Sequence, residues 1–233
     1  YLEREFTSGS IGGMNYPRGL SFGTDGEIFF CEGGKDRFQM LDTNGNNLKT
    51  VSGLDARDSI FIANKLYVIA NDNRQIRVFD ANGTSLFNFG SSGSGNGQFD
   101  EPQGITADYN GSNLEIFVTD SDLNNVQVFS EDGTFLRKFS SVNGDPREIA
   151  VDSNGSLYVG DAADLVNVFD KSGNKLRTIN GISGDPWGLS VYGNRLAVGN
   201  SHDSVHKIRI YDLNGTLIRE FGEWVEASGQ FKK

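Results

Sequence analysis

The chain contains very little cysteine, proline and histidine. Its 233 residues include one cysteine, four prolines and two histidines. A single cysteine excludes an internal disulfide framework. Because Cys31 follows the apolar run 28–30, we predict a buried free thiol rather than a nucleophile. No run of 18 apolar residues occurs, so the sequence predicts no membrane span.

Basic residues are also scarce. Lysine and arginine number 21 against 31 acidic residues, which gives a net charge of −10 and disfavours binding to nucleic acid. An acidic, asparagine-rich surface favours an extracellular or otherwise extracytoplasmic location. Four Asn-Gly-[Ser/Thr] triplets, at Asn82, Asn110, Asn154 and Asn214, match the glycan acceptor pattern. Asn-Gly is also the preferred hairpin turn, and the turn interpretation accounts for all four.

Glycine and aromatic residues are abundant, and they recur with a period. The pattern [Leu/Phe/Tyr]-[Asp/Ser]-x-x-Gly ends at Gly45, Gly83, Gly133, Gly173 and Gly215, in steps of 38, 50, 40 and 42 residues. The longest step contains the Gly/Ser-rich loop 90–98, which we interpret as a flexible connection because it lacks the Gly-Lys-[Ser/Thr] of a phosphate-binding loop. A repeat of roughly 40–45 residues is typical of a β-propeller.

Each repeat has the pattern of a four-stranded antiparallel meander. Between 89 and 139, apolar segments at 105–107, 114–119, 126–129 and 135–139 are separated by turn residues. We predict an all-β propeller in a single domain, 1–233, with five blades at about 15–51, 54–90, 99–140, 145–179 and 185–221. Residues 1–6 resemble the outer strand of an incomplete blade, which favours a sixth blade in an intact, longer protein. In the alternative, five blades close the ring and residues 2–6 form an extra edge strand.

The third repeat carries a family resemblance. Its motifs Phe99-x-x-Pro102-x-Gly104-Ile105-x-Ala107-Asp108 and Phe117-Val118-x-Asp120-x-x-x-Asn124-Asn125-Val126-Gln127-Val128-Phe129 resemble the repeat of NHL-type β-propellers. The other four repeats keep the strand pattern but lose the loop motif. The resemblance implies a propeller fold, and RNA binding is known in that family. A similar propeller lyase uses several histidine ligands, which two histidines hardly supply.

The alternating strand direction of a meander places the start of each first strand beside the loop between its second and third strands. We therefore expect one face to gather Arg18, Asp58, Gln103, Arg147 and Trp187 from equivalent positions, together with Arg57. Acidic loop residues are expected to surround them: Glu32, Asp36, Asp72, Asp120, Asp122, Asp161, Asp164 and Asp203. Two interpretations stay open. In the first, the residues of this face are solvated loop residues. In the second, they form a recognition surface in which Trp187 is the apolar anchor and the arginines bind carboxylates or amides.

Two groups are candidates for metal binding. Asp120, Asp122 and Asn124 have the spacing of the start of a calcium loop, but the glycine and the bidentate glutamate of that loop are missing. His202 and His206 flank a hairpin tip and lack a third zinc ligand nearby in sequence. We predict no cofactor, with calcium or zinc as the alternative.

Taken together, these features favour a non-enzymatic binding or scaffold propeller whose loop face meets a protein, peptide or glycan partner. The first alternative is a metal-dependent lyase or hydrolase that acts in the central channel. The second is an RNA-binding NHL domain.

Overall fold

The computed structural model describes residues 15–140, 144–182, 184–202 and 205–222, without the side chains of residues 201–206. The described chain contains five antiparallel sheets of four strands each, and in every sheet the strands follow one another in sequence order. This confirms the predicted class, all-β with five four-stranded blades. The predicted outer strand at residues 1–6 lies outside the described residues.

The sheets have the following bounds. The first contains β1 (Pro17–Phe22), β2 (Ile28–Glu32), the short 3-10 helix η1 (Gly33–Lys35), β3 (Arg37–Leu41) and β4 (Asn47–Ser52). The second contains β5 (Ala56–Ile62), β6 (Lys65–Ala70), β7 (Gln75–Asp80) and β8 (Ser85–Phe89). The third contains β9 (Pro102–Asn110), β10 (Asn113–Asp120), β11 (Asn125–Ser130) and β12 (Phe135–Ser140). The fourth contains β13 (Pro146–Val151), β14 (Leu157–Asp161), β15 (Leu165–Phe169) and β16 (Lys175–Ile179). The fifth contains β17 (Pro186–Tyr192), β18 (Arg195–His202), β19 (Val205–Asp212) and β20 (Leu217–Phe221).

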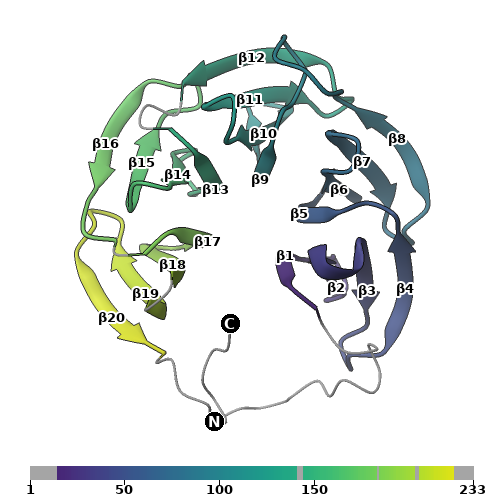
Figure 1. The fold of residues 1–233 in the computed structure, drawn as a ribbon, viewed down its shortest axis with the longest axis horizontal. Helices are drawn as coiled ribbons and strands as arrows, with labels where there is room; N and C mark the ends of the chain where they lie inside the picture. Colours follow the sequence, from purple (N-terminus) through teal and green to yellow (C-terminus); the bar gives the residue numbers. More distant parts are fainter. Residues whose placement is uncertain (1–14, 141–143, 183, 203–204, 223–233) are drawn as a thin grey trace. The chain divides into compact units, whose positions relative to one another are not determined.

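The chain divides into two compact units, Tyr1–Ile105 and Thr106–Lys233, with the boundary inside β9. The first unit holds the first and second sheets. The second unit holds the fourth and fifth sheets and most of the third. Figure 1 shows the same build in every sheet, with the first and fourth strands on opposite sides of the two middle strands. None of the described helical segments is long and apolar enough to cross a membrane.

Turn chemistry explains the repeated Asp-x-x-Gly pattern between the third and fourth strands. In the first sheet, Oδ1 of Asp42 accepts hydrogen bonds from the backbone N–H groups of Asn44 and Asn46, both at 2.8 Å. Gly45 follows with φ +82°, a conformation that costs glycine little. These hydrogen bonds lower the pKa of the Asp42 carboxyl. The glycines of the four Asn-Gly-[Ser/Thr] triplets also have positive φ, so the turn interpretation of those triplets is confirmed.

Neighbouring sheets within a unit pack face to face through apolar side chains. In the first unit, Phe38 and Met40 of the first sheet share a buried cluster with Leu66 and Val68 of the second. The rings of Phe29 and Phe61 stack across this interface, with 5.2 Å between their centroids. Cys31 lies in the same cluster, fully buried, which confirms its prediction as a buried free thiol.

The second unit repeats this packing rule. Val166 and Val168 of β15, with Ile179 of β16, share a buried cluster with Leu196 and Val198 of β18. We call the face that carries the third-strand residues of such an interface the trailing face. We call the opposing face, which carries first- and second-strand residues of the next sheet, the leading face. Each described interface therefore joins the trailing face of one sheet to the leading face of the next.

Candidate functional site

The starts of the first strands lie beside the loops between the second and third strands, as predicted. In the first sheet, the N–H of Gly33 donates to the carbonyl of Tyr16 at 3.2 Å. In the second sheet the N–H of Asn71 donates to the carbonyl of Asp55 at 3.2 Å, and in the fourth the N–H of Ala162 donates to the carbonyl of Asp145 at 3.3 Å. The same end of each sheet therefore presents both segments.

Strand register identifies the equivalent residues. Pro17, Ala56, Pro146 and Pro186 each pair with the end of their second strand, opposite Glu32, Ala70, Asp161 and Asn200. The next residue in each first strand, together with the residue after Pro102 in β9, gives the set Arg18, Arg57, Gln103, Arg147 and Trp187. We call these five residues the start set.

Asp58 does not belong to this set, which corrects the sequence alignment. Ala56 is the residue that pairs with the end of the second strand, so Arg57 is the second residue of β5 and Asp58 the third, one residue further along than expected. The first, third and fifth sheets have Gly19, Gly104 and Gly188 at that position. Arg57 is therefore the residue of the second sheet that matches Arg18.

Asp58 is a buried carboxylate rather than a solvated loop residue. It is 7% exposed, and its Oδ2 accepts a hydrogen bond from the backbone N–H of Ile105 at 2.9 Å. A Cβ atom at position 19 would lie 2.1 Å from Oδ1 of Asp58, so glycine is required there. Burial raises the pKa of Asp58 to about 6, although hydrogen bonds from backbone amides act in the opposite direction.

In the first unit, the start set forms a network of charged and amide groups. The guanidinium of Arg57 pairs with Glu101 at 2.6 Å and donates to Oε1 of Gln103 at 2.9 Å. Arg18 lies over Gly33, where a Cβ atom would come within 2.7 Å of its Nε. Burial, and next the positive charge of Arg57, lower the pKa of Arg18. Arg18, Arg57 and Gln103 are thus brought close to one another.

In the second unit, Arg147 and Trp187 form a stacked pair. The guanidinium carbon of Arg147 lies 4.0 Å from the centroid of the Trp187 ring, and a guanidinium nitrogen lies 3.7 Å from a carboxylate oxygen of Asp185. Trp187 keeps 45% of its surface exposed, whereas the side chain of Arg147 is largely covered. This pair offers an apolar ring held in place by a cation.

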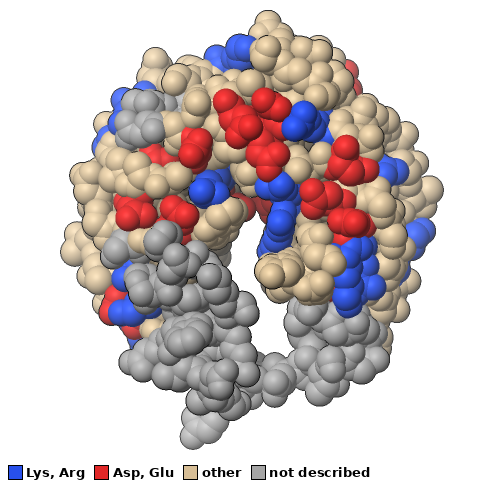
Figure 2. Space-filling view, viewed as in Figure 1, with Lys and Arg blue, Asp and Glu red and all other residues tan. Residues whose placement is uncertain are grey.

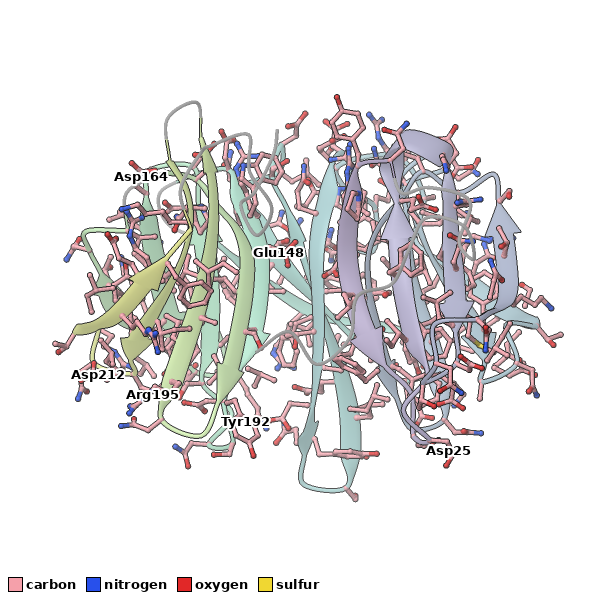
Figure 3. The ribbon with its side chains drawn as sticks, turned by 90° about the horizontal axis from the view of Figure 1, so that it is seen from below. Asp25, Glu148, Asp164, Tyr192, Arg195 and Asp212 are labelled. Atoms are coloured by element: carbon pink, nitrogen blue, oxygen red, sulfur yellow. The ribbon has the colours of Figure 1, made fainter. Side chains whose placement is uncertain are left out.

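The opposite end of the second unit carries the turns. Figure 3 shows Asp164, from the loop between β14 and β15, at one end, and Tyr192, Arg195 and Asp212 at the other. Tyr192 ends β17 and is 89% exposed. The strand therefore carries one exposed aromatic residue near each end, Trp187 at its start and Tyr192 at its end. In each unit, the face seen in Figure 2 carries side chains of both charge signs.

Several acidic residues expected around the start set serve the fold instead. Glu32 is fully buried, pairs with Arg37 and accepts the N–H of Asn15 at 3.0 Å. Asp161 is also fully buried, and it accepts hydrogen bonds from the N–H of Ala163 at 2.9 Å and Nδ2 of Asn167 at 2.8 Å. These carboxylates hold the loop between the second and third strands. Asp203 lies outside the described residues.

The calcium candidates have structural roles as well. The buried carboxylate of Asp120 accepts the N–H of Leu123 at 3.1 Å, and the side-chain oxygen of Asn124 accepts the N–H of Asp145 at 2.7 Å. Asp122 is exposed. The described residues contain no group of three or more His, Cys, Asp or Glu that could hold a metal ion. The side chains of His202 and His206 lie outside the described part of the chain.

Sequence reasoning missed two partners in the site, Glu101 and Asp185. Each directly precedes the proline that begins a first strand, Pro102 or Pro186. Because the residue before proline favours extended backbone, an acidic residue followed by proline was a readable signal for a side chain placed beside the start set.

Comparison with known proteins establishes the fold. No family model matches the chain. Over 98 residues it is 31% identical to protein brain tumor of Drosophila melanogaster, a match that covers 41% of this chain and 9% of that protein. The structure resembles virginiamycin B lyase from Staphylococcus aureus, with 16% identity, 89% of this chain and 70% of that chain covered, and a TM-score of 0.68.

Two further solved structures are similar at the same level. A streptogramin B lyase matches with 18% identity, 91% of this chain and 70% of that chain covered, and a TM-score of 0.70. A nidogen/laminin complex includes a chain with 18% identity, 88% of this chain and 79% of that chain covered, and a TM-score of 0.70. With its five four-stranded antiparallel sheets, the chain is a β-propeller protein.

Proposed function

We propose that the protein is a non-enzymatic binding propeller that recognises a protein partner through the Arg147–Trp187 pair of the second unit. The observation that carries this proposal is the Arg147–Trp187 pair. It presents an exposed indole ring, fixed by a guanidinium at 4.0 Å, at the end of the sheet where first strands begin. Tryptophan and arginine are the residues that most often dominate binding energy at protein interfaces.

Two further features support a recognition surface. The five equivalent positions carry arginine, glutamine and tryptophan rather than one repeated residue, so each sheet contributes different chemistry. The similar nidogen/laminin structure is a complex, which supports protein binding at the level of the fold. The motifs of residues 99–129 support the further proposal that the blades are NHL-type repeats. Peptides and glycans are the other proposed partner classes.

Variants of the pair test this function. Trp187→Ala removes the ring, and Arg147→Lys keeps the charge but loses the planar stack. Tyr192→Ser is the matched control, because it removes an exposed aromatic residue from the other end of the same strand. We expect Trp187→Ala to weaken binding to a partner captured by wild-type protein at least tenfold in a titration. Unchanged affinity for Trp187→Ala, with weaker binding for Tyr192→Ser, would move the interface to the turn end.

A lyase or hydrolase function is the alternative, and the similarity to two lyases is its support. Elemental analysis of purified protein tests the metal-dependent form. A stoichiometric zinc or calcium ion that is needed for turnover would favour the enzyme. RNA binding, the third proposal, predicts an affinity that falls steeply with salt concentration.

An extracytoplasmic location is also proposed from the acidic composition. Glycosidase treatment of protein from its native source is the measurement, since a loss of mass at the Asn-Gly-[Ser/Thr] turns requires a secretory route.

A further inference from the structure

Two of the three arginines in the start set hold a carboxylate of their own unit. Arg57 pairs with Glu101 at 2.6 Å, and Arg147 pairs with Asp185 at 3.7 Å. Within the part of the chain that the structure describes, the guanidinium of Arg18 forms neither an ion pair nor a hydrogen bond. Arg18 is therefore the arginine of the start set whose charge is not neutralised by a direct contact.

The two ion pairs follow one rule. In each, the arginine at the second position of a first strand reaches the acidic residue directly before the first strand of the next sheet. The rule assigns Asp55, directly before β5, to Arg18. The carboxylate of Asp55 instead accepts a hydrogen bond from Nδ2 of Asn71 at 3.2 Å. Its effect on the pKa of Arg18 is smaller than the opposite effect of the Arg57 charge.

The side chain of Arg18 lies against the loop of its own sheet. The N–H of Gly33 donates to the carbonyl of Tyr16, the bond that Asn71 and Ala162 make in the second and fourth sheets. Those two residues have a Cβ atom, whereas a Cβ atom at position 33 would lie 2.7 Å from Nε and 2.8 Å from Cζ of Arg18. The missing side chain at Gly33 leaves room for the guanidinium against the backbone of this loop.

The first sheet also lacks the acidic residue before its first strand. The other four described sheets have an acidic residue at this position, namely Asp55, Glu101, Asp145 and Asp185. The first sheet has Tyr16, which is 71% exposed and has a φ of +49°, a backbone conformation that is unusual for a bulky residue. The first strand of this sheet therefore begins with an exposed aromatic residue and a cation, without the negative charge that would repel an incoming anion.

We propose that Arg18 binds a carboxylate of a partner molecule, in the role that Glu101 has toward Arg57 and Asp185 has toward Arg147. A guanidinium presents paired N–H donors that match the two oxygens of a carboxylate. Arg18 is exposed, so such a ligand can reach it. The carboxylate belongs to an acidic side chain of a protein or to a free small molecule, and both make the same contact. This site lies in the first unit and goes beyond the proposed function, which rests on the second unit.

The Nε–Hε resonances of arginine side chains report binding at this site directly. The wild-type protein is titrated with glutarate, and separately with two end-blocked peptides that carry either a glutamate or a glutamine at the same position. The Arg18 resonance is identified by its absence from the spectrum of Arg18→Ala. We expect it to shift in a saturable way with glutarate and with the glutamate peptide, and to stay in place with the glutamine peptide.

Two variants separate this contact from a general effect of charge. Arg18→Ala should weaken binding of the acidic ligands at least about tenfold, because it removes charge-assisted hydrogen bonds. Arg74→Ala is the matched control. It removes the same charge from the loop between β6 and β7 of the first unit, but Arg74 already pairs with Asp100 at 3.2 Å. We expect Arg74→Ala to bind the acidic ligands as the wild-type protein does.

The comparison of the ligands identifies the source of the carboxylate. Tighter binding of the glutamate peptide than of glutarate would assign the site to an acidic side chain, and equal or tighter binding of glutarate would assign it to a small carboxylate. Three results would overturn the proposal: an Arg18 resonance that does not move, an equal loss of affinity in Arg74→Ala, or tighter binding of inorganic phosphate than of glutarate. The Arg147–Trp187 pair does not enter this titration, so the failure of this site and the failure of the proposed function are distinguishable.

Discussion

Replacing the buried Asp58 by asparagine is expected to stabilise the protein at neutral pH. Asparagine has nearly the same shape, and its carbonyl oxygen can still accept the N–H of Ile105, but it carries no charge. A carboxyl pKa that rises from 3.8 in the unfolded chain to about 6 in the fold means that ionisation costs about 3 kcal/mol of stability at pH 7. Asp58→Asn removes that cost.

The sign of the pH dependence follows from the direction of this change. Because the folded pKa is raised, the native state binds more protons than the unfolded state between about pH 4 and pH 6. The wild-type protein therefore loses stability as pH rises through this window, relative to Asp58→Asn. The two proteins should be equally stable below pH 4 and differ by about 3 kcal/mol above pH 6.

Urea unfolding at several pH values measures the difference directly, and a thermal scan at pH 7 should show a gain of roughly 6–12 °C. Asp72→Asn is the control, because Asp72 is exposed on the loop between β6 and β7. Other acid effects are common to all three proteins and cancel in the comparison. Two results would refute the claim that the ionised Asp58 carboxylate destabilises the fold. One is an Asp58→Asn protein that is less stable than wild type at pH 7, and the other is a stability difference that does not change with pH.

Three further changes test the packing and the turns. Glu115→Gln should destabilise the protein by about 2 kcal/mol in urea unfolding, because the two hydrogen bonds from Arg137 at 2.8 and 2.7 Å would lose their carboxylate. Arg137 lowers the pKa of Glu115, so this stabilisation is present at neutral pH and is lost as pH falls through the folded pKa. If the wild-type protein stays more stable than Glu115→Gln at a pH where Glu115 is protonated, the ion pair is not the source of the difference. Gly111→Ala should cost about 1 kcal/mol for its φ of +65°, since nothing lies within 4 Å of the added Cβ. Gly173→Ala should lower the stability more than Gly111→Ala, because its Cβ would overlap the Phe139 side chain. Equal losses in the two variants would show that the Phe139 side chain moves aside without cost.

The turns and strands could be predicted from the sequence because their causes are local. An aspartate that accepts the N–H groups two and four residues later, followed by a glycine with positive φ, produces the same turn wherever it occurs. Alternation of apolar residues then sets the strands on either side. The buried thiol of Cys31 followed from the same local pattern.

The environment of Asp58 could not be predicted because its causes are not local. The polar run Asp55-Ala56-Arg57-Asp58-Ser59 has the composition of a solvated loop. Its burial depends on the lack of a side chain at Gly19 and on the backbone of Ile105, which is 47 residues away. Glu32 and Asp161 were misplaced for a different reason. Their partners Arg37 and Asn167 are close in sequence, but they come within reach only through the pairing of the second and third strands.

The two ends of the sheets are under different physical constraints, and this difference is the strongest argument for the location of a binding surface. At the turn end, hydrogen bonding and backbone conformation restrict the residues in every repeat to nearly the same set: Asp42, Asp80, Asp170 and Asp212, with Ser130 and Asp132 sharing the role in the third sheet. The second residue of each first strand has no such role, so its side chain can vary without changing the turn or the core. Specific recognition needs chemistry that differs from blade to blade, and the start set provides it at equivalent positions. A partner that bound the turn end instead would meet an aspartate-anchored turn in every blade, and weaker binding after substitution of the exposed Tyr192 would locate the interface there.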